Sequence, residues 1–197
     1  MRLPPFRDGF LKHLRLDGER IFLRPQRGKD WRAWSRLRLS SRDFLAPWEP
    51  TWPADALTRH AYRRRVKAQL IESRQGLGYT LHIFRHQDHA LLGAITLGQI
   101  RRGVALTATL GYWIGEPYAR QGYMAEAMEL IMRFGFRELG LHRLEAACLP
   151  SNDASQALLK RLGFVEEGIA RGYLRIAGEW RDHLLFARLA DDNFASR

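Results

Sequence analysis

The sequence predicts an α+β fold, and three observations support this prediction. Short segments rich in β-branched and aromatic residues, bounded by glycine and proline, alternate with longer segments whose apolar residues recur at helical spacing. Two strand-to-helix turns stand in tandem in the second half of the chain. The 197 residues, of which 46% are hydrophobic and 11% aromatic, fit one compact domain with a sizeable core. We therefore expect a single domain over residues 1–197.

The first half of the chain predicts one strand and two helices. A β-branched and aromatic segment at 20–24 predicts the strand, which Pro25 ends. Helical segments follow at 30–40 and 57–75. The segment at 47–53 separates them as a loop, because its prolines disfavour a continuous helix.

The second half of the chain begins with strands. Three strand segments come first, at 79–84, 91–100 and 107–114. The first two form a hairpin through the turn at 86–89. The end of the chain predicts another hairpin, with strands at 173–176 and 180–189. The two strand–helix units lie between these hairpins.

A turn at 118–127, with the sequence YARQGYMAEA, joins the 107–114 strand to a helix. The first N–H groups of a helix have no intrahelical partner, and the helix dipole adds partial positive charge, so an anion is attracted there. Gly122 lets a ligand approach the backbone closely. The turn is therefore a candidate phosphate site, although strand–glycine–helix turns also occur for packing alone.

A second strand-to-helix unit spans 144–164. Pro150 stops its strand, Ser151 or Asn152 can cap its helix, and Gly163 ends the helix. Two such units in tandem are more specific than either one alone.

Together the two units resemble the two acetyl-CoA motifs of the GNAT N-acetyltransferase superfamily. The RQGYMA turn matches the first motif, and the pattern Asn-x-x-Ser…Leu-Gly-Phe-x-x-x-Gly, which begins at Asn152, matches the second. Three further segments look like the RimJ-type branch, which acetylates the N-terminal alanine of a ribosomal protein; they are 42–50, 111–115 and 180–183. The resemblance covers nearly the whole chain, from about Leu16 to Leu189.

The turn departs from the superfamily pattern at two positions. Its first position is usually Gln or Arg and is Ala119 here, while Met124 stands where a small residue is usual. Binding at this turn rests on backbone amides, so the loss of one side chain need not abolish it. We expect Arg120 to supply the side-chain phosphate contact that Ala119 cannot make.

The resemblance implies a three-layer fold, with a mixed, mostly antiparallel central sheet and helices on both faces. The strands that end near Ile114 and start near Arg143 would splay apart and leave backbone groups unpaired. The pantetheine arm of acetyl-CoA, itself a chain of amides, would satisfy these groups as an added strand. By this analogy it lies along Tyr112, Trp113 and Ile114. The backbone of six residues then cradles the pyrophosphate: Arg120, Gln121, Gly122, Tyr123, Met124 and Ala125.

The chemistry that the resemblance implies is direct transfer of an acetyl group from a thioester to an amine. The amine must lose its proton before it attacks, and the leaving thiolate needs a proton or a hydrogen bond. Neither demand requires a metal. The family places such groups at the start of the second motif's helix, so we assign Ser155 as the thiolate hydrogen-bond donor and Asn152 as a cofactor-positioning residue. Both side chains can also serve only as helix caps.

No residue stands out as the single general base. Glu116 and Asp182 are carboxylates that can act through water. Glu49 lies beside Trp48 and Trp52 in the loop that overhangs the acceptor side in this fold, where a carboxylate among aromatics can hold an N-terminal ammonium. The prolines of this loop equally favour a rigid turn whose tryptophans pack on the core.

The cysteine and histidine content favours structural roles. Cys148 is the only cysteine and lies within an apolar strand, which predicts a small buried core residue. His82, His86 and His89 show neither zinc-ligand spacing nor a pairing with a nucleophile, and we expect surface or hairpin positions for them. The sequence predicts no metal site.

A net charge of +11, from 32 Lys plus Arg against 21 Asp plus Glu, calls for anionic partners. Acetyl-CoA accounts for part of this charge. The remainder fits either a solvated surface or attraction to ribosomal RNA or an acidic peptide, without sequence-specific DNA recognition. No apolar run spans a bilayer and no signal peptide opens the chain, so we expect a cytoplasmic protein without membrane contact.

The resemblance as a whole implies an acetyltransferase that modifies the N-terminal α-amine of a protein, with a ribosomal protein carrying N-terminal Ala as the favoured acceptor. Two alternatives remain open. One is acetylation of a small amine such as a polyamine or an aminoglycoside. The other is a non-catalytic module that binds the ribosome or a nucleic acid. The sequence leaves open whether the protein is a monomer or a homodimer.

Overall fold

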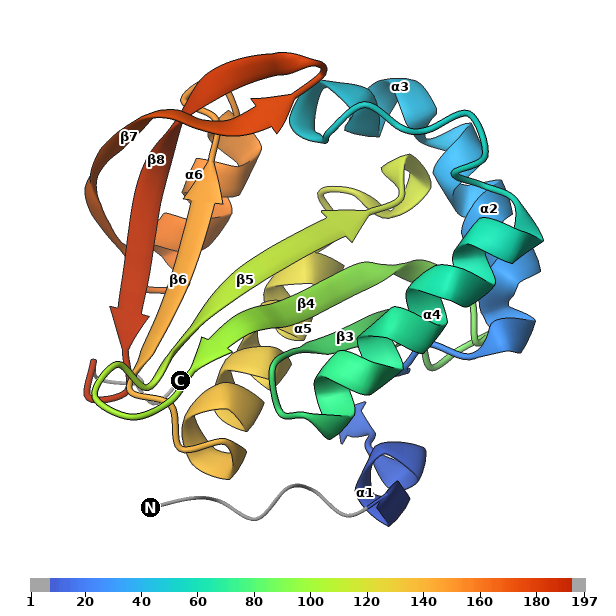
Figure 1. Ribbon diagram of the computed structural model, residues 1–197, viewed down its shortest axis with the longest axis horizontal. Coiled ribbons are helices and arrows are strands. Elements are labelled where there is room, and N and C mark those ends of the chain that lie inside the picture. The colour runs from blue at the N-terminus through green and yellow to red at the C-terminus, as the bar shows by residue number, and fades with distance from the viewer. Residues whose placement is uncertain (1–7, 193–197) are drawn as a thin grey trace.

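The computed structural model describes residues 8–192, in which eight strands form one open sheet (Figure 1). The strand order is β1-β2-β3-β4-β5-β6-β8-β7. Every neighbouring pair is antiparallel except β5 and β6, which are parallel, so the prediction of a mixed, mostly antiparallel sheet is confirmed. The strands are β1 (Leu16–Asp17), β2 (Ile21–Pro25), β3 (Tyr79–Arg85), β4 (Leu91–Arg101), β5 (Thr107–Ile114), β6 (Arg143–Cys148), β7 (Val165–Ile176) and β8 (Glu179–Leu189).

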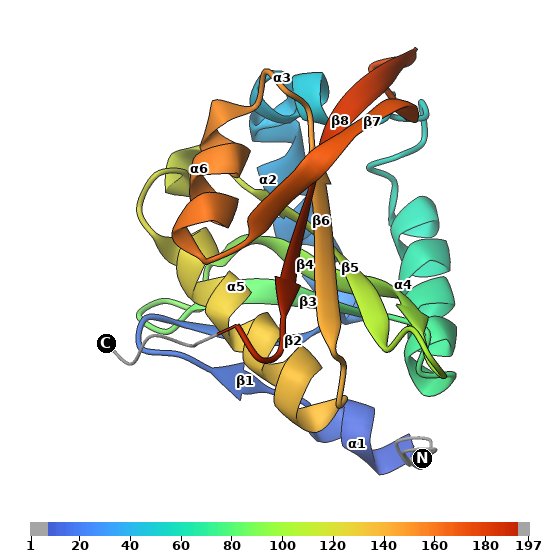
Figure 2. The same ribbon diagram turned by 90° about the vertical axis from the view of Figure 1, so that its left-hand side faces the viewer.

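Helices cover both faces of this sheet (Figure 2). On one face α2 and α4 pack with the sheet in a small cluster that includes Phe22, Trp34 and Tyr62. On the other face α5 lies against the main core, to which Ile21 and Leu23 contribute. Alternation along β2 thus sends neighbouring side chains to two different cores. The helices are α1 (Asp8–His13), α2 (Trp31–Ser40), α3 (Arg42–Leu45), α4 (Arg59–Arg74), α5 (Tyr123–Arg133) and α6 (Asp153–Arg161).

The observed elements differ from the predicted ones in three places. The last hairpin is longer than predicted, because β7 begins at Val165 rather than at 173. The loop at 47–53 follows a short helix, α3, and begins within a single 3-10 turn at Ala46–Trp48. The helix α1 and the two-residue strand β1 were not predicted, since short elements carry too few residues for a periodic pattern.

Strands β5 and β6 pair over four residues only, from Thr107 opposite Arg143 to Leu110 opposite Ala146. Beyond that point β5 continues along β4, and β6 continues along β8. The two strands therefore diverge toward their carboxyl ends (Figure 1), which confirms the predicted splay.

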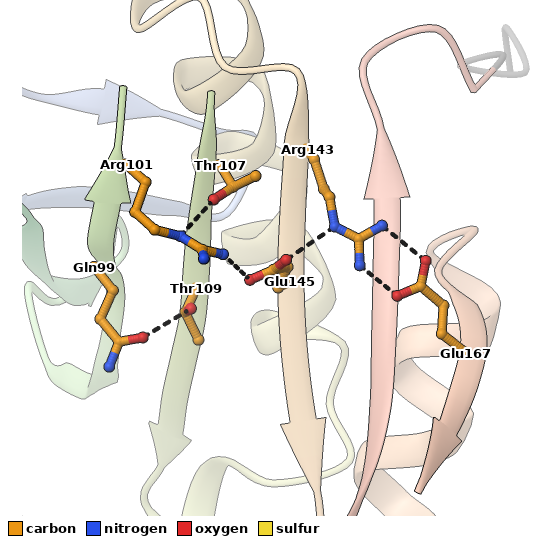
Figure 3. Close-up of polar contacts among 7 residues, drawn as sticks. All are labelled: Gln99, Arg101, Thr107, Thr109, Arg143, Glu145 and Glu167. Carbon is orange, nitrogen blue, oxygen red and sulfur yellow. Dashed lines mark hydrogen bonds and ion pairs between the residues drawn. The ribbon is translucent and has the colours of Figure 1, made fainter. Parts of the chain in front are cut away.

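A ladder of side chains joins the strands at the closed end of this splay (Figure 3). The Glu145 carboxylate on β6 accepts hydrogen bonds from Arg101 on β4, at 3.1 Å, and from Arg143, at 2.9 Å. Arg143 also binds the Glu167 carboxylate of β7 through both terminal nitrogens. Arg101 further donates to Thr107 Oγ1 on β5. Because these contacts lie where β5 and β6 are paired, they hold the strands together at one end while the other end opens.

Residues 8–192 contain no membrane-spanning helix and no cluster of metal ligands. No helix in this range combines the length and the apolar character needed to cross a bilayer. Nor does the described part of the chain bring three or more His, Cys, Asp or Glu side chains together as a metal-binding group.

We predict that Gly93→Ala destabilises the protein and disturbs the end of β5. A Cβ atom at Gly93 would overlap the Trp113 carbonyl oxygen and lie 2.9 Å from the Ile114 Cα, both of which belong to the backbone of the splayed strand. We expect the free energy of unfolding, measured by chemical denaturation, to fall by about 1–3 kcal/mol. The matched control is Gly98→Ala on the same strand, whose Cβ would meet only the Thr96 methyl group at 3.5 Å. Equal stability of the two variants would contradict the prediction.

Candidate active site

The loop between β5 and α5 presents free backbone N–H groups. Arg120 and Gly122 adopt left-handed conformations, with φ of 59° and 82°, and Gly122 is the N-cap of α5. Within residues 8–192, no acceptor bonds the backbone N–H groups of positions 120–125. Glu126 is the first residue of this stretch whose N–H is bonded, to the Gly122 carbonyl. Six consecutive donors at a helix N-terminus make a strong anion site.

Met124 and Tyr123 follow the loop with buried side chains. The Met124 side chain belongs to the main core, which explains why a large apolar residue is accepted where the superfamily usually has a small one. The Arg120 side chain is exposed. The contact expected between the Arg120 side chain and a phosphate stays a prediction.

Arg20, the residue directly before β2, forms hydrogen bonds with this loop and with α5. Its Nη1 donates to the Gln121 carbonyl at 3.0 Å, and its Nε donates to Glu126 Oε2 at 3.1 Å. Its own backbone N–H donates to Glu126 Oε1 at 2.8 Å, and its guanidinium lies 4.8 Å from the centre of the Tyr123 ring. Arg20 thus places a guanidinium, which is paired with Glu126, beside the free amides. Sequence analysis missed it, because no local pattern links residues 106 positions apart.

At the open end of the splay, a hydrogen bond joins β5 to α6. The Tyr112 hydroxyl and Ser155 Oγ lie 2.7 Å apart. Ser155 is held in place because its backbone N–H donates to Asn152 Oδ1 at 3.0 Å, which makes Asn152 the N-cap of α6. Burial raises the pKa of the Tyr112 phenol to about 12, although the bond to Ser155 opposes the shift. Tyr112 is therefore a protonated hydroxyl at neutral pH.

Cys148, on the facing strand β6, is buried, as predicted. Burial raises the pKa of its thiol, and an interaction with the Ser155 hydroxyl opposes this shift. Tyr112, Ser155 and Cys148 thus form one polar group at the open end of the splay, between β5 and β6. A buried neutral thiol is a weak nucleophile.

The opposite side of β5 borders a cavity. Trp113 points away from α6 and packs with the small cluster of α2 and α4. The adjoining cavity, of about 380 Å³, is lined by residues of α2, α4, β5 and the proline-rich loop; among them are Glu49, Trp52 and Trp113. Trp48 is not among its lining residues and is partly exposed.

The Glu49 carboxylate in this cavity is already well bonded. Arg38 donates to both of its oxygens, at 2.6 and 2.5 Å, and Trp52 Nε1 donates to Oε2 at 2.8 Å. The Arg38 guanidinium also lies over the Trp52 ring, at 4.1 Å. The structure therefore brings together two of the three predicted acceptor-binding residues, Glu49 and Trp52, through an arginine that the sequence analysis did not connect with them.

The two candidate bases lie outside the Tyr112–Ser155 group. Glu116 is exposed directly after β5, and its backbone N–H donates to Ser41 Oγ at 3.0 Å. Asp182 is exposed on β8, where its Oδ1 accepts from the Gly172 N–H at 2.7 Å. Neither carboxylate hydrogen-bonds to Tyr112 or Ser155. Their proton-transfer roles remain predictions.

His82 lies in the hairpin of β3 and β4, which is one of the two positions expected for it, but it does not lie at the surface. Alternation along β3 turns this side chain under α4, where it is fully buried beside Tyr62. Its Nδ1 lies 3.5 Å from Asp30 Oδ2. Burial lowers the pKa of His82, so the imidazole is neutral and forms part of the smaller core rather than a titrating site.

Known proteins resemble this chain in sequence and in fold. A family model described as "Acetyltransferase (GNAT) domain" matches residues 20–165. The Escherichia coli [Ribosomal protein uS5]-alanine N-acetyltransferase is 32% identical over 91% of this chain and 92% of its own length. A probable N-acetyltransferase of Bacillus subtilis, YjcK, is 34% identical over 90% of this chain and 98% of its own length. A solved structure of Mycobacterium smegmatis RimJ in complex with CoA-disulfide superposes with a TM-score of 0.85, at 34% identity, over 89% of this chain and 85% of that chain.

We predict that Cys148 is slow to react with alkylating reagents in the folded protein. Because burial raises the pKa of its thiol, little thiolate is present at pH 8 and the reagent has poor access. Native protein should react with iodoacetamide at least about ten times more slowly than protein unfolded in guanidinium chloride. Mass spectrometry gives an unambiguous readout, since the chain has one cysteine. Equal rates in the two states would show that the thiol is neither buried nor suppressed.

Proposed function

The chain belongs to the GNAT acetyltransferase family, and we propose that it transfers the acetyl group of acetyl-CoA to the N-terminal α-amine of a protein. The observation that carries the proposal is the opening between β5 and β6, which ends beside six free backbone N–H groups. The opening fits a chain of amides, and the N–H groups fit a diphosphate. Membership of this family favours catalysis over the non-catalytic binding module.

Acetyl-CoA binds along the exposed edge of β5. The amides of its pantetheine arm pair with the backbone of Tyr112, Trp113 and Ile114, which no longer pairs with β6. Its diphosphate accepts hydrogen bonds from the N–H groups of 120–125, and the Arg20 guanidinium lies beside them.

The thioester then lies at the open end of the splay, beside Ser155. The uncharged amine attacks the carbonyl carbon, a tetrahedral intermediate forms, and the carbon–sulfur bond breaks to release the thiolate of CoA. The attacking nitrogen loses its second proton as the amide forms, and water carries that proton to the thiolate. The Ser155 hydroxyl stabilises the thiolate by donating a hydrogen bond to it, and the Tyr112 phenol, which is protonated at neutral pH, donates to Ser155 Oγ through the 2.7 Å contact. Asn152 positions Ser155 by capping α6.

The proton lost by the acceptor ammonium goes to water, and we assign the exposed carboxylates Glu116 and Asp182 as candidates to relay it. Glu49 is less available for this step, since Arg38 and Trp52 already occupy its oxygens. We assign Trp52 and Glu49 to the wall of the acceptor pocket. Trp48 is assigned to its outer rim.

The favoured acceptor is a ribosomal protein with N-terminal Ala. The support is the match over nine-tenths of the chain to an enzyme named for alanine N-acetylation of ribosomal protein uS5. Such an acceptor would place the protein in the cytoplasm. A small amine remains the second candidate, supported by the size of the acceptor-side cavity, about 380 Å³.

We predict that Ser155→Ala lowers kcat by about ten- to a thousand-fold and leaves the KM for acetyl-CoA nearly unchanged, because the lost interaction is made mainly as the thiolate leaves. Release of free thiol from acetyl-CoA measures the rate. The matched control is Ser151→Ala, an exposed serine just before the same helix, which should keep full activity. An unchanged kcat in Ser155→Ala would remove the donor assignment.

We predict that peptides beginning with Ala are acetylated faster than those beginning with Ser or Thr, and faster than small amines. The assay incubates each acceptor with acetyl-CoA and identifies products by mass, so that α-amine and side-chain acetylation are distinguished. Equal rates on all acceptors would refute the N-terminal alanine assignment while leaving the acetyl transfer itself in place.

A further inference from the structure

Arg65 of α4 lines the acceptor-side cavity, and in residues 8–192 no carboxylate forms an ion pair with its guanidinium. Its guanidinium lies 4.0 Å from the centre of the Trp34 ring and 5.6 Å from that of Tyr62. Two of its nitrogens, Nε and Nη2, are buried without a hydrogen-bond partner in the described structure. Across residues 8–192, the ion pairs of α4 include Arg64 with Asp55, but none is made by Arg65. A buried donor without a partner is unfavourable and is usually explained by a missing ligand or water.

The charges around the cavity favour an anion as that ligand. Glu49 is the acidic residue of the lining, and its oxygens are taken by Arg38 and Trp52. Burial, followed by repulsion from Arg38, lowers the pKa of Arg65 to about 10, so the guanidinium stays charged at neutral pH. Glu49 attracts Arg65 without pairing with it directly. An incoming ammonium would therefore find no free carboxylate here, whereas an incoming anion would find an arginine that has no directly bonded carboxylate.

The outer surface of α4 carries the same sign of charge. Apart from Arg65, its basic residues still outnumber its single acidic residue, Glu72, and would draw an acidic acceptor toward the cavity; they are Arg59, Arg63, Arg64, Lys67 and Arg74. The cavity also borders Trp113, on the side of β5 opposite Ser155. An acceptor that enters here approaches the splayed strand from the face that the Tyr112–Ser155 pair does not occupy.

We infer that Arg65 binds a carboxylate carried by the acceptor and so selects acceptors that have one near the reacting amine. This inference rests on the proposed acetyl transfer to an amine and names a chemical feature of its acceptor. The carboxylate can come from an acidic side chain close behind a protein N-terminus, or from the α-carboxylate of a small amino acid. Arginine suits this role because its charge is weakly hydrated and its planar donors match a carboxylate.

The test compares matched acceptors that differ only in the carboxylate. One pair is a peptide with N-terminal Ala and Asp or Glu at its second to fourth positions, and the same peptide with Asn or Gln there. The other pair is alanine and alaninamide. We expect the wild-type protein to prefer the carboxylate member of at least one pair by about tenfold or more in kcat/KM, and the preferred pair identifies the source of the carboxylate.

Three variants distinguish a direct contact of Arg65 with the carboxylate from a general effect of positive charge on α4 and from a loss of folding. Arg65→Met keeps a long stem over Trp34 but removes the charge, and should abolish the preference; Arg65→Lys should retain part of it. Arg63→Met removes the same charge from an exposed position of the same helix and should keep the preference. Thermal unfolding confirms that each variant is folded. A preference that persists in Arg65→Met, or a wild-type protein without any preference, would overturn the inference.

A second readout does not depend on turnover. Binding of the N-acetylated peptides to the CoA-loaded protein is measured by calorimetry, and the acidic peptide should bind about tenfold more weakly to Arg65→Met than to wild type. If no acceptor is acetylated but this difference is found, the acceptor assignment fails and the carboxylate site stands. If acetylation proceeds and both proteins bind the acidic peptide equally, the carboxylate site fails and the acetyl transfer stands.

Discussion

The site depends on one constraint, which is that the only parallel strand pair of the described sheet stops after four residues. Strand β5 remains with its antiparallel neighbour β4 as far as Ile114, and β6 remains with β8 as far as Cys148, so the two cannot stay together. The backbone of β5 beyond Leu110 then has donors and acceptors without a partner strand on one edge. Backbone donors and acceptors in proteins are nearly always paired, with water where they are exposed and with another protein group or a ligand where they are covered. A ligand that is itself a chain of amides meets that demand.

Alternation along β5 divides the opening into two chemically different sides. Tyr112 faces α6, where Ser155 and Cys148 complete a group of neutral hydroxyls and a thiol. Trp113 faces α2 and the proline-rich loop, where Arg38, Glu49 and Arg65 bring charge. Because neighbouring side chains of a strand point to opposite faces, the site for the departing sulfur and the site for the incoming amine lie on opposite sides of β5. The loop at 120–125 continues the same strand and supplies the anion site.

Much of this arrangement could be predicted from the sequence, because its signals are local. The turn glycine Gly122 stands directly before α5, where a helix was predicted to begin, and of the two predicted cap residues, Ser151 and Asn152, it is Asn152 that caps α6. The contacts of Arg20 with Glu126 and of Arg38 with Glu49 could not be predicted, since they depend on tertiary packing between elements distant along the chain. The first residues of β7 were also missed, because that edge strand is exposed on both faces and lacks an apolar alternation.

Amide hydrogen exchange with and without CoA tests the central claim most directly. If the cofactor completes the edge of β5 and occupies the free N–H groups after it, exchange at 111–114 and 120–125 slows by more than about tenfold on saturation, while the closed end of the β5–β6 pair is unaffected. Saturable binding of CoA that leaves exchange in both segments unchanged would contradict the account.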